Sequence, residues 1–97
     1  MRTVARNARV RRGPEVLHRV LEGEALLVDL ASGRFFGLDP VGTFVWEGIE
    51  EEVPVADLVE RVTAEFRVDA GRAERDLLAL LGDLARRGLV EVRPAAR

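Results

Sequence analysis

Cysteine and lysine are absent from this 97-residue chain, and histidine and serine occur once each, at His18 and Ser32. Without cysteine the protein forms no disulfide and offers no thiolate to a metal. No apolar run approaches the roughly 18 residues that indicate a transmembrane helix. The basic first twelve residues are not followed by the apolar stretch of a secretory signal. We therefore expect a cytoplasmic protein with no membrane partner, no metal and no other cofactor.

Residues suited to catalysis are scarce. His18 falls in a run of branched apolar residues typical of a strand, where it is either a ligand or base, or simply a strand residue. Ser32 falls in a turn, where serine makes local hydrogen bonds, and no base is placed to activate it. The three acids at 50–52 are typical of a solvated loop, and the glycines form no phosphate-binding motif. The sequence therefore predicts no enzymatic activity.

The charges are distributed unevenly along the chain. Residues 1–12 carry five Arg and no acid, whereas residues 13–97 carry ten Arg and all seventeen acids, a net charge of −7. We expect a flexible basic arm over residues 1–14, a single folded domain over residues 15–92 and a frayed tail over residues 93–97. An acidic folded body argues against a DNA-binding surface on the domain itself.

The first part of that domain has the pattern of a β-meander. Apolar runs at 16–21 and 25–30 and a shorter run at 34–38 are separated by turn signals at 22–23 and 31–33. In the second run Leu26, Val28 and Leu30 share one face at period two. Two tight turns predict three sequential antiparallel strands, with the third at the sheet edge.

Helical patterning follows the third strand. Asp39 and Pro40 form a helix start, Pro54 starts a second helix, and Asp69 caps a third helix that ends before Gly88. The short connector between the second and third helices predicts a helix-turn-helix, and residues 89–92 suit a short final strand. The predicted fold class is α+β and winged helix-turn-helix-like, with a three-stranded antiparallel sheet followed by three helices (βββααα).

The predicted edge strand allows two interpretations. Phe35 and Phe36 either both belong to the core, with the first helix covering the edge, or they border an edge to which a peptide strand adds. In the third helix, a flank of Asp76, Leu80, Asp83 and Arg87 has the mixed character expected of a groove for a basic or neutral peptide. The opposite flank, with Glu74, Leu78 and Ala85, is an alternative that the sequence does not exclude.

Several motifs, in order, carry a resemblance to the PqqD-like family of leader-peptide recognition elements. They are the segment Ser32-Gly33-Arg34-Phe35-Phe36-Gly37-Leu38-Asp39, the element Phe44-Val45-Trp46, and the helix end formed by Asp76-Leu77, Leu80-Leu81, Leu84 and Gly88-Leu89-Val90. The resemblance covers about residues 15–92. Asp39 stands where many members have Asn, but both residues cap helices.

The resemblance implies a non-catalytic protein that captures the leader segment of a ribosomally made precursor peptide. The leader would add as a strand to the third strand, in a groove closed by the third helix, and the chain would deliver it to modifying enzymes. The chain looks most like the stand-alone proteins of lasso-peptide biosynthesis, whose partners are a leader peptidase and a macrocycle-forming cyclase. A monomer with a free edge is expected. The resemblance places the peptide-binding residues at Arg34, Phe35, Phe36, Gly37, Leu38, Asp76, Ala79, Leu80, Asp83 and Arg87.

Three alternatives stay open. A PqqD-type chaperone for a radical-SAM enzyme would use the same fold. A winged-helix DNA-binding protein would insert Arg72, Arg75 and Arg86 of the third helix into the major groove, although the acids on that helix count against nucleic acid as a partner. A structural subunit would dimerise through its sheet edge.

Overall fold

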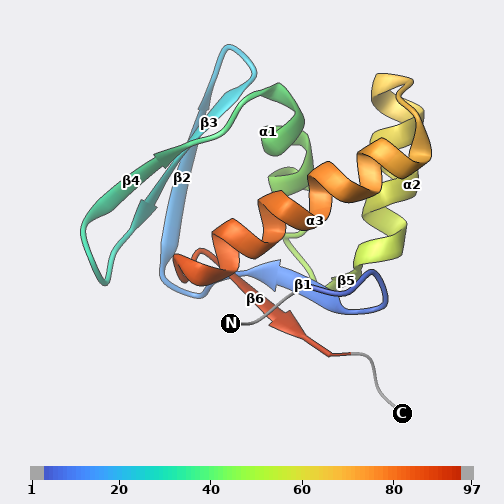
Figure 1. The fold of residues 1–97 in the computed structure, drawn as a ribbon. Helices are drawn as coiled ribbons and strands as arrows, with labels where there is room; N and C mark the ends of the chain where they lie inside the picture. Colours follow the sequence, from blue (N-terminus) through green and yellow to red (C-terminus); the bar gives the residue numbers. More distant parts are fainter. Residues whose placement is uncertain (1–3, 95–97) are drawn as a thin grey trace.

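A computed structural model describes residues 4–94 of the chain. Two small antiparallel sheets and three helices surround one core (Figure 1). The elements are β1 (Arg9–Arg12), β2 (Val16–Leu21), β3 (Glu24–Asp29), β4 (Arg34–Gly37), α1 (Pro40–Glu47), β5 (Val53–Pro54), α2 (Val55–Phe66), α3 (Ala70–Arg86) and β6 (Val90–Arg93). The predicted α+β class, with a three-stranded sheet followed by three helices, is confirmed.

The predicted meander is the sheet β2-β3-β4. Glu22 and Gly23 join β2 to β3 with positive φ angles of 53° and 79°, as a two-residue hairpin loop requires. In the next turn the Asp29 carboxylate accepts hydrogen bonds from the Ala31 amide and the Ser32 hydroxyl. The local chemistry of both turns therefore fixes the register of all three strands and leaves β4 at the edge.

One face of this sheet is covered and the other is exposed. Ala25 and Leu27 of β3 are buried, on the side where α1 packs. The apolar stripe noted in the sequence lies on the opposite face, where Leu26 is 43% and Leu30 is 55% exposed. Period two correctly indicated a strand, but it did not show which face is turned toward the core.

A second sheet, β5-β1-β6, corrects the expected flexible arm and frayed tail. Its central strand is β1, and Val10 is completely buried. Arg93 belongs to β6, while residues 1–3 and 95–97 lie outside the described part. The strand was missed because its apolar positions alternate with arginines, which gave it the composition of a solvated arm.

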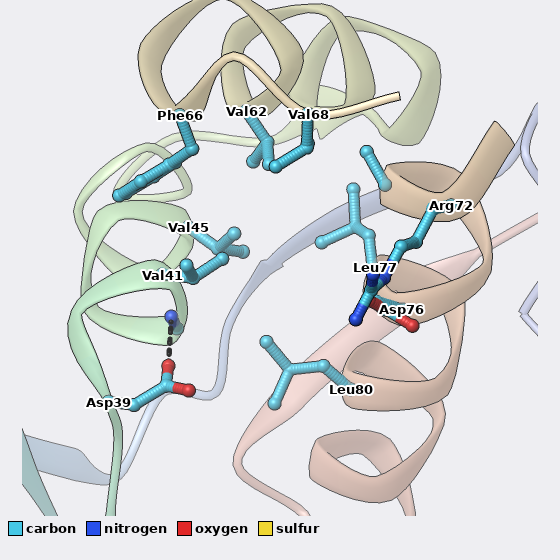
Figure 2. Close-up of a pocket in the computed structure, with 12 residues that line it drawn as sticks. Asp39, Val41, Val45, Val62, Phe66, Val68, Arg72, Asp76, Leu77 and Leu80 are labelled. Carbon is cyan, nitrogen blue, oxygen red and sulfur yellow. Dashed lines mark hydrogen bonds and ion pairs between the residues drawn. The ribbon is translucent and has the colours of Figure 1, made fainter. Parts of the chain in front are cut away.

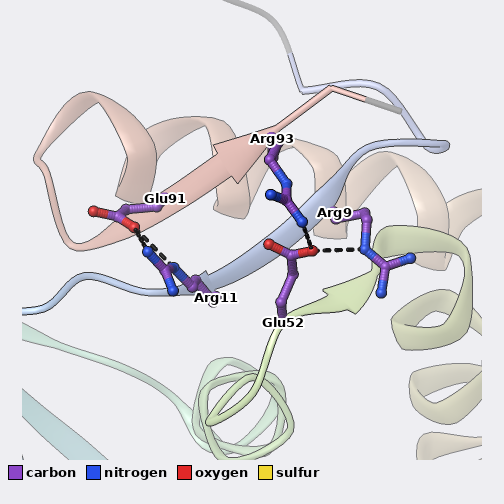
Figure 3. Close-up of polar contacts among 5 residues, drawn as sticks. All are labelled: Arg9, Arg11, Glu52, Glu91 and Arg93. Carbon is purple, nitrogen blue, oxygen red and sulfur yellow. Dashed lines mark hydrogen bonds and ion pairs between the residues drawn. The ribbon is translucent and has the colours of Figure 1, made fainter. Parts of the chain in front are cut away.

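Ion pairs account for two of the three arginines of β1, Arg9 and Arg11 (Figure 3). Glu52 accepts hydrogen bonds from Arg9, at 2.7 Å, and from Arg93, and Arg11 lies 2.8 Å from Glu91. The hydrogen bond from Arg9, and then the one from Arg93, lower the pKa of the Glu52 carboxyl. Arg9 and Arg11, which were expected to belong to a flexible arm, therefore pair with acids at the second sheet.

The starts of α1 and α3 and the end of α3 lie where their capping residues predict. The Asp39 carboxylate accepts from the Gly42 amide at 2.8 Å to start α1, and the Asp69 carboxylate accepts from the Arg72 amide at 3.0 Å to start α3. Gly88, with a φ of 76°, follows the end of α3. The α2–α3 connector is short, as predicted. The largest completely or almost completely buried side chains are Trp46, Leu27, Ile49, Leu58, Leu81 and Leu84.

Candidate functional site

The outer edge of β4 has no strand beside it in the described part of the chain. The Leu38 amide donates to the Ala25 carbonyl at 2.8 Å, which continues the β3–β4 pairing one residue past β4. In an antiparallel ladder, alternate residues direct their N–H and C=O groups to the same partner. The backbone groups of Arg34, Phe36 and Leu38 therefore face β3, and those of Phe35 and Gly37 face outward.

The side chains of β4 also alternate between two environments. Phe36 is half-buried on the helix side, where the Arg87 guanidinium lies 4.7 Å from the centre of its ring. Leu38 is in the core, at 5% exposure, whereas Phe35 is 66% exposed on the opposite face. The hypothesis that both phenylalanine rings are core residues is wrong for Phe35. Since α1 packs against β3, the free edge of β4 stays open (Figure 1).

A hollow of about 320 Å³ lies between β4 and the C-terminal end of α3. Phe36 and Leu89 provide apolar surface, while Arg34, Arg86 and Arg87 provide positive charge. Asp83 accepts hydrogen bonds from Arg86 and Arg87, both at 3.3 Å. We call this hollow the arginine hollow.

A second hollow, of about 350 Å³, lies between α1, the end of α2 and the first half of α3. Figure 2 shows its apolar side chains directed inward from three helices. Asp39 is at the rim, but its carboxylate already caps α1. Asp76 is also at the rim, 3.6 Å from Arg72, with both side chains well exposed. We call this the apolar hollow; its apolar lining is Val41, Val45, Val62, Phe66, Val68, Ala73, Leu77 and Leu80.

The α3 flank proposed from sequence connects the two hollows. Asp76 and Leu80 line the apolar hollow, and Arg87 lines the arginine hollow. Ala79 is exposed and lines neither of them. On the alternative flank, Glu74 pairs with Arg6 at 3.4 Å, away from β4. The geometry therefore turns the Asp76–Arg87 flank toward α1 and β4.

Sequence reasoning missed several lining residues. Arg86 was considered as a DNA contact in the winged-helix alternative but not as a peptide contact, and Val62, Phe66 and Val68 were not among the predicted site residues. No local signal identifies them, because the hollows are formed by elements that meet only in the folded chain.

The single histidine and the single serine of the chain both make local contacts within the fold. The His18 ring packs edge-on against Trp46, with ring centres 5.9 Å apart. The Ser32 hydroxyl donates to Asp29 at 2.8 Å. Within residues 4–94 no cluster of three or more potential metal ligands is found, and no helix there is long and apolar enough to cross a membrane.

The family model described as coenzyme PQQ synthesis protein D (PqqD) matches residues 24–90, which include β3, β4 and all three helices. The chain belongs to the PqqD family. This match confirms the resemblance that the sequence motifs carry. The matched region of this PqqD-family protein includes the residues that line both hollows.

Two solved structures resemble this PqqD-family chain. One, described as TbiB1 in complex with the TbiA(beta) leader peptide, is 34% identical, has a TM-score of 0.78, and covers 84% of this chain and 94% of its own. The other, described as lasso peptide synthetase B1 complexed with the leader peptide, is 26% identical, has a TM-score of 0.74, and covers 84% of this chain and 96% of its own. No curated protein sequence matches the chain.

Proposed function

We propose that this PqqD-family protein captures the leader segment of a ribosomally made precursor peptide and performs no chemistry itself. The observation that carries the proposal is the open edge of β4, where Phe35 and Gly37 direct backbone groups outward beside the Asp76–Arg87 flank. An added strand would gain affinity from main-chain hydrogen bonds, and the two hollows would select its side chains. The two similar structures, both described as leader-peptide complexes, support this function.

The same proposal extends to the partners. We infer that the chain acts as a monomer and presents the bound leader to a leader peptidase and a macrocycle-forming cyclase of lasso-peptide biosynthesis. The description of the second similar structure as a lasso peptide synthetase supports this choice over a radical-SAM partner. Copurification with each enzyme encoded beside this gene, with and without the precursor, distinguishes these pairings.

The DNA-binding alternative has less support. Arg72 pairs with Asp76 and Arg86 with Asp83, so cations needed for phosphate contacts are already next to acids. Arg9 and Arg11, in the segment that was expected to be a flexible basic arm, pair with acids at the second sheet and are therefore not free for phosphate contacts.

Titration calorimetry with the leader half of a precursor encoded beside this gene tests the proposal. We expect one peptide per chain and binding in the micromolar range or tighter, corresponding to at least about 8 kcal/mol. A scrambled leader of the same composition is the control. Absence of heat and of any spectral change with the native leader would contradict leader capture.

A further inference from the structure

Among the described residues, more cations than acids lie in or next to the arginine hollow. Arg34, Arg86 and Arg87 line it, and the nearby acids are Asp29 and Asp83. The Asp29 carboxylate already accepts hydrogen bonds from the Ala31 amide and the Ser32 hydroxyl within its own turn. Asp83 is shared between two arginines. The hollow therefore has an excess of positive charge and of N–H donors.

One of these donors is held in a defined position. The Arg87 guanidinium lies against the Phe36 ring, and its Nε donates to Asp83, so its terminal nitrogens are not needed for that bond. Arg34 is exposed and forms no ion pair with another described residue. A planar guanidinium that is already oriented suits a carboxylate, because little side-chain freedom is lost on binding.

The hollow lies on one side of the open edge. Residues opposite each other in adjacent strands place their side chains on the same face. A peptide residue opposite Arg34 or Phe36 therefore directs its side chain to the helix side of the sheet, where the hollow lies. The apolar hollow lies beyond the other end of β4, past Leu38, where Asp39 is at its rim.

We propose that the arginine hollow is a carboxylate site that reads one Asp or Glu of the captured peptide. This inference rests on the proposed leader capture and specifies the chemistry of the peptide. As long as the peptide stays extended, this acid lies an even number of residues from the side chain that enters the apolar hollow. The expectation of a basic or neutral peptide at Asp83 changes accordingly, because Asp83 is already paired and its surroundings have an excess of positive charge.

A displayed library of random peptides tests the site and does not require the sequence of the leader. Peptides are selected on the wild-type chain, on Arg34→Glu and on Arg19→Glu. Arg19 is the matched control, since it is also an exposed arginine of the same sheet but lies on the face opposite the arginine hollow. Arg86→Gln is a second variant that removes a charge without reversing it, and thermal unfolding checks the fold of all variants.

We expect wild-type selections, and those on Arg19→Glu, to share an acid at one aligned position, and those on Arg34→Glu to lose it or exchange it for a base. For a single selected peptide, an acid-to-amide change weakens wild-type binding by about two- to five-fold at low salt, the range for a partly exposed pair. The same change has a smaller effect on Arg34→Glu and Arg86→Gln. Binding peptides without an acid preference would overturn the carboxylate site and leave leader capture intact. Selections that yield no peptide dependent on the β4 edge would overturn leader capture, and the carboxylate site with it.

Discussion

Proline substitutions in β4 test whether the leader pairs with the backbone groups that alternate residues of this strand direct outward. In Gly37→Pro the edge loses the one amide that Gly37 offers to an added strand. A side chain built at Gly37 meets no atom within 4 Å, and the Gly37 amide faces away from β3, so the fold should survive. Losing one hydrogen bond and leaving its peptide acceptor unpaired costs about 1–3 kcal/mol, a factor of roughly 5 to 150 in Kd.

The matched control is Gly37→Ala, which adds a Cβ but keeps the amide, and should bind the leader as the wild type does. The inward position is Phe36, whose backbone faces β3. Phe36→Pro should lower the free energy of unfolding by about 3 kcal/mol or more relative to Phe36→Ala, because proline interrupts the pairing with β3.

Fluorescence anisotropy with a labelled leader measures binding, and circular dichroism during thermal unfolding measures stability. Phe35→Pro should behave as Gly37→Pro does, with a folded chain and weakened binding. If Gly37→Pro is folded and its Kd equals that of Gly37→Ala, the leader does not add to β4, and the reasoning from the edge is refuted.

Three further predictions concern stability and the apolar hollow. Glu52→Gln should lower stability at neutral pH, because the folded-state pKa of Glu52 is lowered. The ionised Glu52 carboxylate stabilises the fold above its unfolded pKa of about 4.3, and this stabilisation is lost as pH falls through its lower folded pKa. The stabilities of variant and wild type should therefore converge at low pH. A difference that stays constant with pH would contradict the ion-pair account. Val10→Ala should cost about 1–3 kcal/mol in urea unfolding, against about 0–1 kcal/mol for Arg11→Ala, and equal losses would refute a central position for β1. Leu80→Asn should weaken leader binding with a smaller loss of thermal stability than Leu81→Asn, because Leu80 is only partly buried against the core and Leu81 is completely buried. Unchanged binding by Leu80→Asn would exclude the apolar hollow from the site.

The sequence revealed those elements whose signals are local. Asp39 and Asp69 cap helices through their own carboxylates, and Glu22 and Gly23 form a two-residue turn, so the helix starts and the meander could be predicted from short segments. The edge position of β4 followed from the order of the strands alone.

The remaining features depend on contacts between distant segments. Arg9 and Arg93 lie opposite each other in adjacent strands and both donate hydrogen bonds to Glu52, so an arginine-rich segment becomes a central strand, and no local sequence pattern predicts this. The sequence does not show which alternate amides of β4 face β3. The hydrogen bond from the Leu38 amide to the Ala25 carbonyl shows it in the structure. The hollows could not be predicted because they depend on how helices from different parts of the chain pack together.

The pairing of β1 with β6 has a consequence for how the protein emerges from a ribosome. The strands β2, β3 and β4 are neighbours in sequence and can pair soon after they leave the exit tunnel, whereas Arg9 must wait for Arg93. A nascent chain that has reached the end of α3 therefore already contains the β4 edge, while β1 still lacks its long partner strand. Until β6 arrives, the completely buried Val10 of the finished protein lacks part of its cover, so this apolar position stays accessible to chaperones and proteases during that interval.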